Sequence, residues 1–158
     1  MTYIGALLVI FAAFTVWRVY CSYLFEESNM LRAFLHAICD YRDNMKCYLK
    51  SPKEWADDYS EDIPTEFISA VRNGEGLLKA YLKTEGRGYL PKDIDCALEE
   101  CFSHLGEGYL ETELVITEAA IDKLTAEEKL LCGELGKKKK TVGALIGAFA
   151  VGLIILII

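Results

Sequence analysis

The two histidines of this chain are the side chains best suited to bind a metal ion or to transfer a proton near neutral pH. Possible metal ligands lie about one helical turn from each of them in the sequence: Cys39 and Asp40 beside His36, and Glu100 and Cys101 beside His104. One such group does not complete a tetrahedral site, so the two histidines would have to converge in the fold. We expect ordinary core or surface histidines, without a metal-binding or catalytic role.

One cluster of acidic residues could collect a divalent cation: Asp57, Asp58, Glu61 and Asp62. The cluster lacks the residue order of an EF-hand loop, which has a central glycine and a terminal glutamate. We therefore expect these carboxylates to lie at a solvated end of a helix.

Nucleophile and nucleotide-binding motifs are absent from the sequence. No serine lies in a G-x-S-x-G context, and no glycine-rich loop carries the lysine of a P-loop. The six cysteines include no C-x-x-C pair, so we expect free thiols in a reducing cytoplasm, and a disulfide-bonded extracellular domain is the alternative. The sequence thus predicts a protein that is not an enzyme and that has no cofactor.

Two apolar runs lie at the ends of the chain, and all the other residues lie between them. Residues 141–158 are 18 positions without a charge, close to the ~20 residues that cross a ~30 Å hydrocarbon core. Residues 3–25 form the other run, which only Arg18 interrupts, near the end where its guanidinium can reach the lipid head groups. A cleaved signal peptide is the alternative for this run, but no basic residue precedes Arg18. We predict an N-terminal transmembrane helix within 1–25 and a C-terminal one within 137–158.

Basic residues beside these runs predict the orientation of the chain. Four consecutive lysines precede the C-terminal run, and such clusters stay on the cytoplasmic side of a membrane. The segment 26–136 is then cytoplasmic, and the two spans form a hairpin in the cell membrane. The residues that we expect at the membrane interface are Arg18, Lys137, Lys138, Lys139 and Lys140.

The segment 26–136 is strongly acidic, because it holds all 24 acidic residues and 12 of the 17 basic ones, a net charge of −12. Nucleic acid is therefore not an expected partner. The sequence leaves two explanations of the excess acid open, namely solubility and a docking face for a basic partner protein.

The periodicity of this segment is that of helices, without sustained strand alternation. Local signals mark the helix starts and breaks: a capping box over Ser51, Pro52 and Glu54, further starts at Ile63-Pro64 and Pro91, and turns at Asn73-Gly74 and 85–88. We expect an all-α fold, an antiparallel helical bundle flanked by N- and C-terminal transmembrane helices.

The last soluble helix is expected to start near Tyr109 and to carry a heptad pattern. Six of its eight members are apolar: Leu110, Leu114, Thr117, Ile121, Leu124, Glu128, Leu131 and Leu135. Such a stripe should pack along one neighbouring helix. If the helix runs unbroken into the C-terminal span, Gly133 and Gly136 are the positions where it could bend at the membrane surface.

Small residues recur in the C-terminal run at four-residue steps, in two series: Gly143 with Gly147, and Ala144 with Ala148 and Gly152. Such faces let helix backbones approach closely in lipid. Glycine is also simply commoner in membrane helices than in soluble ones. The pattern therefore leaves open whether these residues pack on small residues of the first span, on another subunit or on no partner.

The order of these parts resembles that of the stage III sporulation protein AB family of endospore-forming bacteria, over nearly the whole chain. Four features carry the resemblance: a Gly-Ala-apolar stretch at Ile4–Ile10, helix starts at Ser51-Pro52 and Ile63-Pro64, the segment Cys101–Gly106 before a long charged helix, and lysines ahead of a Gly143-rich end. None of these features is a catalytic signature, so their order and spacing make the resemblance specific.

The resemblance implies a non-enzymatic subunit of the channel complex that joins mother cell and forespore during spore formation. Such a subunit would lie in the mother-cell membrane around the forespore, with a domain similar to the cytoplasmic domains of type II secretion platform proteins. The implied partners are a secretion-type cytoplasmic ATPase, other membrane channel subunits and the lipid bilayer. The alternative is a membrane-tethered helical regulator or sensor unrelated to secretion.

Overall fold

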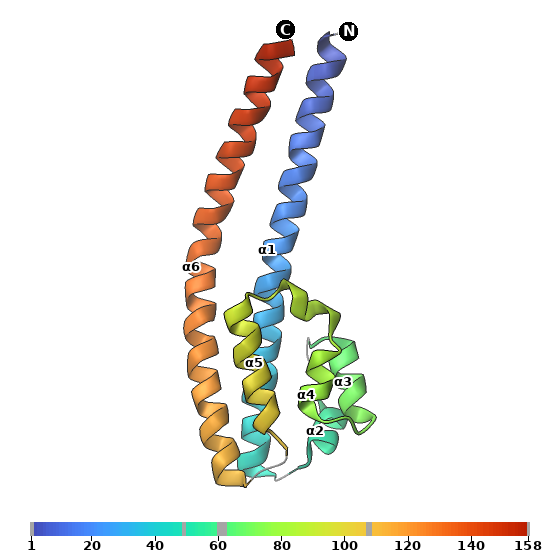
Figure 1. The fold of residues 1–158 in the computed structure, drawn as a ribbon, viewed down its shortest axis with the longest axis vertical. Helices are drawn as coiled ribbons and strands as arrows, with labels where there is room; N and C mark the ends of the chain where they lie inside the picture. Colours follow the sequence, from blue (N-terminus) through green and yellow to red (C-terminus); the bar gives the residue numbers. More distant parts are fainter. Residues whose placement is uncertain (1, 49, 60–62, 107–108, 158) are drawn as a thin grey trace. The chain divides into compact units, whose positions relative to one another are not determined.

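The computed structural model describes all residues except 1, 49, 60–62, 107–108 and 158, and the described residues form helices and connecting segments (Figure 1). The helices in this part of the chain are α1 (Thr2–Cys47), α2 (Pro52–Asp58), α3 (Thr65–Arg72), α4 (Leu77–Leu82), the short 3-10 helix η1 (Glu85–Tyr89), α5 (Lys92–His104) and α6 (Leu110–Ile157). The predicted all-α fold is confirmed, with two long helices at the ends of the chain flanking a central helical region.

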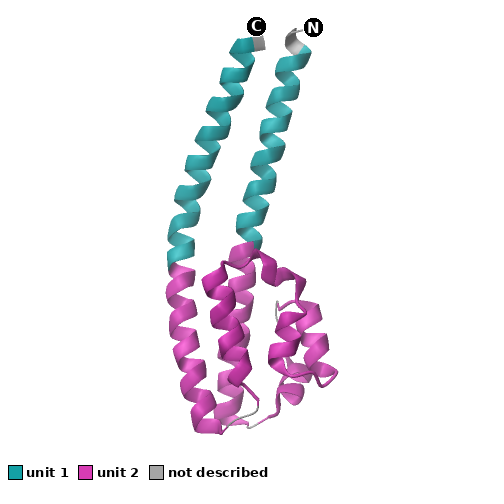
Figure 2. Ribbon diagram, in the orientation of Figure 1, with its two compact units in different colours: residues 1–26, 130–158 teal, residues 27–129 magenta. Residues whose placement is uncertain are grey.

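The structure divides into two compact units (Figure 2). Residues 1–26 and 130–158 form one of them, which we call the paired-helix unit, and residues 27–129 form the other, which we call the bundle unit. Helices α1 and α6 each contribute to both units. The bundle unit lies within the segment 26–136 that we predicted as the central domain.

The core of the bundle unit is a cluster of aromatic rings from four helices. The Phe34 ring of α1 makes edge-on contacts with three others, at centroid distances of 5.5 Å to Phe67 of α3, 5.1 Å to Tyr81 of α4 and 5.9 Å to Phe102 of α5. The side chains of Phe34, Phe67 and Tyr81 are fully buried. Each such pair adds about 0.5–1.5 kcal/mol beyond the burial of its area. The cluster therefore fixes the short helices onto α1.

Helix α6 packs on this unit through the predicted heptad face. Thr117 and Leu124 are fully buried, as the pattern predicts. Two ion pairs set its direction, since Arg32 of α1 bonds to Glu128 at 2.9 Å and Lys46 bonds to Glu118 at 2.6 Å. Lys46 comes after Arg32 in α1, whereas its partner Glu118 comes before Glu128 in α6. The two helices are therefore antiparallel here.

Helix ends follow the local signals of the sequence. Ser51 and Glu54 form a reciprocal capping box at the start of α2, and Pro64 and Pro91 are the N-cap residues of α3 and α5. Gly74 has a backbone φ of +84° in the turn after α3, a conformation that L side chains rarely adopt. The predicted starts and the first of the two predicted turns are confirmed.

The second predicted turn is different in the structure. Residues 85–89 continue as the 3-10 helix η1 instead of a simple turn. Gly86 lies against the Sδ and Cε atoms of Met30 in α1, so a side chain at this position would require Met30 to move. The segment thus lies in contact with α1, which spacing along the sequence does not reveal.

The paired-helix unit consists of the first part of α1 and the last part of α6, which run side by side (Figures 1 and 2). The Trp17 ring covers Gly143, where an added Cβ would lie 3.0 Å from the ring. Most large apolar side chains of the unit face outward, among them Leu7, Phe11 and Phe149. By length and composition, both helices are apolar enough to cross a membrane, with mean hydropathies of 1.9 and 1.8 in their most apolar windows.

Candidate functional site

The side chains weighed as possible metal ligands do not form a metal-binding cluster in the described part of the structure. His36 and His104 are both exposed, as are Asp57 and Asp58, whereas Glu61 and Asp62 lie outside the described residues. Among the residues that the structure describes, no three His, Cys, Asp or Glu side chains gather so that they could hold a metal ion.

A small cavity between α5 and α6 is bordered by the residues weighed beside His104. Its volume is about 240 Å³, and its lining includes Glu100, Cys101 and His104 of α5 and Lys123 of α6. Burial and, to a lesser extent, the neighbouring Glu100 together raise the pKa of Cys101 to about 12. The thiol therefore stays protonated at neutral pH, and a protonated thiol is neither a strong nucleophile nor a metal ligand.

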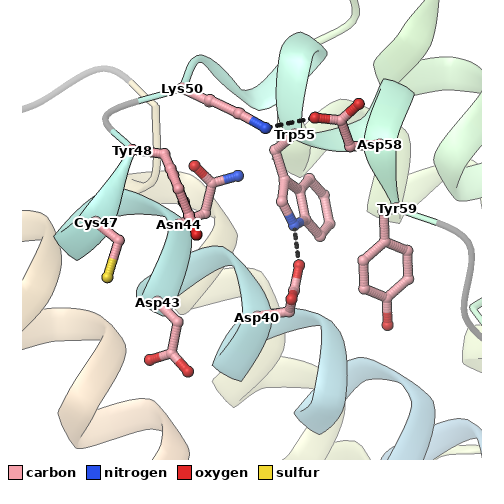
Figure 3. Close-up of a pocket in the computed structure, with 9 residues that line it drawn as sticks. All are labelled: Asp40, Asp43, Asn44, Cys47, Tyr48, Lys50, Trp55, Asp58 and Tyr59. Atoms are coloured by element: carbon pink, nitrogen blue, oxygen red, sulfur yellow. Dashed lines mark hydrogen bonds and ion pairs between the residues drawn. The ribbon is translucent and has the colours of Figure 1, made fainter.

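A larger groove lies where the C-terminal end of α1 meets α2, and we take it as the candidate functional site (Figure 3). Its volume is about 450 Å³, within the ~300–1,000 Å³ range of ligand pockets. The residues that line it are Asp40, Asp43, Asn44, Cys47, Tyr48, Lys50, Trp55, Asp58 and Tyr59. Three carboxylates and three aromatic rings thus border one hollow.

Trp55 anchors this groove. The capping box at Ser51 starts α2 so that Trp55, one turn later, reaches back to α1. Its ring is 3% exposed and packs against Tyr41 and Tyr59 at centroid distances of 5.3 and 5.1 Å. The indole Nε1 donates a hydrogen bond to Asp40 Oδ2 at 2.7 Å, drawn as a dashed line in Figure 3. This bond satisfies the only donor of the buried indole.

Cations of the chain itself already bind the other two carboxylates. Lys50 Nζ pairs with Asp58, and it also lies 5.4 Å from the centroid of the Tyr48 ring. The hydrogen bond to Asp58 raises the pKa of Lys50. Arg42 binds Asp43 through Nε and Nη2, at 2.8 and 2.7 Å. The groove therefore combines carboxylates and an exposed ring in a way that holds positively charged groups.

Asn44 is the polar residue of the groove that the fold leaves unsatisfied. Its side chain is 9% exposed, and its Oδ1 has no hydrogen-bond partner in the described part of the chain. A buried acceptor left without a donor costs about 1–3 kcal/mol. Figure 3 draws the amide among the side chains that line the groove. The oxygen itself is buried from solvent, so it does not open onto the groove.

A second polar cluster has a structural role. Arg87 of η1 binds Asp95 of α5 through two bonds of 3.1 and 2.8 Å and also pairs with Glu99. The Tyr81 hydroxyl donates to Asp95 Oδ1 at 2.6 Å. Burial opposes ionisation of Asp95, but the bonds from Arg87 and Tyr81 outweigh it and lower its pKa. The cluster ties η1 and α4 to α5.

The predicted interface residues lie on the surface of the paired-helix unit. Arg18, Lys137, Lys138 and Lys140 are exposed, and Lys139 is half-buried. Lys138 bonds to Glu134 one turn earlier, at 3.0 Å.

The five predicted packing residues of the C-terminal span separate into two groups. Gly143 contacts Trp17 of the first span, as described above. An added Cβ at Gly147 or Gly152 would meet nothing within 4 Å, and Ala144 and Ala148 are exposed. Within the described unit, Gly143 alone of the five is thus seen to approach the other span.

The groove was not found from the sequence. Asp40 and Asn44 are four residues apart on α1, and both interrupt an apolar stripe, which is the one signal that could have marked them. Trp55, the partner of Asp40, belongs to another helix, and the resemblance to a sporulation family names no residue of this groove. Comparison with protein-family models, with curated proteins and with solved structures gives no match to the chain.

Proposed function

We propose that this protein is a non-enzymatic, membrane-anchored assembly subunit that attaches a partner protein to a membrane. The two spans hold the bundle unit at the inner leaflet, and the bundle contributes the docking surface. Following the resemblance, the partner is a secretion-type cytoplasmic ATPase, and the assembly is the channel between mother cell and forespore, with further membrane channel subunits beside this one.

The observation that carries the proposal is the exposure of apolar side chains on the paired-helix unit. None of the side chains in the most apolar window of α1 or of α6 is buried. The core helix of a soluble protein would be mostly buried. Continuous exposed apolar surfaces usually mark contact with a membrane or with another protein. Lipid is the environment that fits two helices of this length.

The basic residues agree with this interpretation. Because the two helices are antiparallel and Trp17 lies against Gly143, a rise of ~1.5 Å per residue brings Arg18 nearly level with Lys140. Arg18 and the four lysines thus lie at one end of the apolar surface. Trp17 lies at the same height along the helix pair. Aromatic and basic residues are enriched at the membrane interface in this way.

The bundle unit supplies a separate argument for docking. It has its own aromatic core, so its surface is not needed to complete the fold. The excess of acidic residues in the segment 26–136 would attract a partner protein with a basic surface. The docking surface would act through charge, and its affinity should fall as salt rises.

Two experiments test the proposal. Full-length protein should stay in the membrane pellet after alkaline carbonate extraction and should leave it only with detergent. Protein solubilised in mild detergent from sporulating cells of its source should co-purify with a secretion-type ATPase at low salt and lose it at high salt. Recovery in the soluble fraction would refute the membrane attachment. Co-purification with a signalling protein and no ATPase would favour a membrane-tethered regulator instead.

A further inference from the structure

The paired-helix unit carries an apolar groove between its two helices, which we call the span groove. Its lining runs from Val9 to Val16 on α1 and from Leu145 to Leu153 on α6. Its volume is about 540 Å³, within the ~300–1,000 Å³ range of ligand pockets. Every side chain that lines it is apolar, so the group that it holds must be apolar too.

Short and long side chains together give the span groove its shape. Ala12, Ala13 and Ala150 line it with single methyl groups, so the space lies over these positions. Leu145 and Phe149 beside them are large and are 65% and 71% exposed. A hollow of this kind suits a narrow, flexible hydrocarbon chain.

A third helix fits the span groove less well than a hydrocarbon chain does. Helices approach closely in lipid where small residues face the partner. The open glycines of α6, Gly147 and Gly152, do not line the span groove, and neither does the exposed Ala148. The small-residue positions that are open to another helix thus lie outside it.

One end of the span groove lies close to the basic residues. Val16 and Leu145 line that end, directly beside the contact between Trp17 and Gly143. Lys140 comes five residues before Leu145, which is about 8 Å along the helix at a rise of ~1.5 Å per residue. A lysine side chain is long and flexible enough to place its ammonium group near this end.

Positive charge at that end is largely uncompensated. Residues 1–26 and 130–158 include five basic and two acidic residues, a net charge of +3. Lys138 pairs with Glu134, whereas Lys139 and Lys140 make no ion pair within the described part of the chain. Lys139 is half-buried and lies two turns before Ile146 on the same face of α6. An occupant with an anionic group at this end would therefore be attracted.

We propose that the span groove binds an acyl chain of an anionic phospholipid, whose head group lies against Lys139 and Lys140. A soluble anion would satisfy the lysines but not the apolar groove, whereas a phospholipid satisfies both. Basic sites beside membrane spans bind acidic head groups through the same attraction. This inference rests on the proposed membrane attachment, to which it adds a specific class of lipid.

The test places one copy of the full-length protein in each nanodisc of phosphatidylcholine, with a fixed minor fraction of phosphatidylglycerol whose acyl chains are brominated. Bromine quenches the fluorescence of a tryptophan that it contacts. Trp17 follows Val16 at the end of the span groove, so it should be quenched. Trp55 is buried in the bundle unit and should not be. Brominated phosphatidylcholine at the same fraction should quench Trp17 severalfold less.

A variant that fills the span groove locates the acyl chain. Ala12→Leu places a larger side chain in the groove and should lower the quenching by brominated phosphatidylglycerol severalfold. Ala148→Leu is the matched control, because it makes the same change at an exposed alanine that does not line the groove. Its quenching should equal that of the parent.

A second pair of variants locates the head group. Lys139→Gln/Lys140→Gln should lower the preference for phosphatidylglycerol by about fivefold for each lysine removed. Lys123→Gln/Lys129→Gln removes two exposed lysines of the same helix that lie outside the paired-helix unit, and it should keep the preference of the parent.

Indole signals show that the variants are folded. The chain has only two tryptophans, so ¹⁵N labelling gives two indole N–H signals, and a Trp17→Phe variant assigns them. The signal of Trp55 should keep its position in all four variants. Trp17→Phe should also abolish the quenching, because Trp17 is the residue that the lipid contacts.

Four results would overturn the inference. They are equal quenching by the two brominated lipids, equal quenching in Ala12→Leu and Ala148→Leu, release of the quenching by inorganic phosphate at constant ionic strength, and its loss when each nanodisc holds two copies. The third result would assign the lysines to a soluble anion, and the fourth would assign the span groove to a second copy of the chain.

The proposed function fails separately from this lipid site. If the protein resists carbonate extraction but shows no preference for phosphatidylglycerol, only the lipid site is wrong. If carbonate releases the protein from the membrane pellet, the membrane attachment itself is wrong.

Discussion

Phe34 is the residue on which the bundle unit most depends, because its ring contacts rings of three other helices at once. Its side chain has no exposed surface. A cavity left at this position would be lined by rings that are themselves fixed by their backbones, so little of it could close.

Phe34→Ala should therefore lower the free energy of unfolding by about 3–5 kcal/mol. Chemical denaturation of the full-length protein in detergent, followed by near-ultraviolet circular dichroism, measures this change. Phe25→Ala makes the same chemical change at a ring that is 58% exposed, and it should cost less than about 1 kcal/mol. Equal losses in the two variants would show that the aromatic cluster is not the core.

Asp95 makes the stability of the bundle unit depend on pH. Bonds from Arg87 and Tyr81 hold its pKa below the ordinary value of 3.8. Because the pKa is lower in the folded state, the stabilisation by ionised Asp95 is complete above about pH 4 and is lost as the pH falls toward the folded value. Asp95→Asn should thus be less stable than the parent at pH 7, and the difference should shrink in acid.

Urea unfolding at pH 7, 5 and 3 would measure this difference. Asp93→Asn is the matched control, since Asp93 is an exposed acid in the same first turn of α5. A difference between Asp95→Asn and the parent that stays constant from neutral to acid pH would contradict the ionic role of Asp95.

The helix starts and turns that the sequence predicts correctly are those marked by residues within one turn of chain. The capping residues at Ser51, Pro64 and Pro91 and the glycine at Gly74 act within one turn of chain, so spacing alone predicts them. The 3-10 helix at 85–89 was not predicted in this way; its Gly86 contacts Met30, more than fifty residues earlier, and such a contact leaves no local signal.

The groove was missed for the same physical reason. Asp40 and Asn44 lie on α1, and Trp55 of α2 reaches Asp40 only because the chain reverses after Cys47. An unsatisfied amide cannot be recognised in a sequence, because satisfaction depends on neighbours that only the fold supplies. The heptad of α6, in contrast, was recognisable, because one helix carries the whole pattern.

The start of α2 controls the groove as well as the helix. Ser51→Ala removes one half of the capping box and should lower the free energy of unfolding by about 1 kcal/mol. It should also broaden or shift the indole N–H signal of Trp55, since α2 is too short to hold its position without the cap. Ser51→Asp retains a capping oxygen and should restore both properties. An unchanged Trp55 signal in Ser51→Ala would mean that core contacts alone position this ring.

The contact between Trp17 and Gly143 allows a test of helix pairing within the paired-helix unit. Gly143→Leu places a side chain where the Trp17 ring lies 3.0–3.1 Å from an added Cβ. The indole N–H signal of Trp17 should therefore move, whereas that of Trp55 should not. Gly147→Leu is the matched control, because nothing lies within 4 Å of an added Cβ there. A Trp17 signal that moves equally in both variants would exclude the described pairing.

At the scale of the whole molecule, the ends and the middle of the chain are chemically opposite. Long apolar segments with basic residues beside them lie at the ends, and a segment with a net charge of −12 lies between them. Composition alone predicts this division, because lipid and water select side chains over long stretches. From this division we predict a direction across the membrane, with the acidic segment on the side of the lysines.

That direction can be tested with cysteines of the chain itself. Cys47 and Cys96 are exposed on the bundle unit, whereas burial raises the pKa of Cys101 and makes it unreactive. In spheroplasts, a membrane-impermeant maleimide should label Cys47 and Cys96 only after the membrane is permeabilised. A cysteine added before Met1 is the control, and it should react in intact spheroplasts because a hairpin keeps both termini outside. Labelling of Cys96 without permeabilisation would put the acidic segment outside the cell, where no cytoplasmic ATPase could reach it.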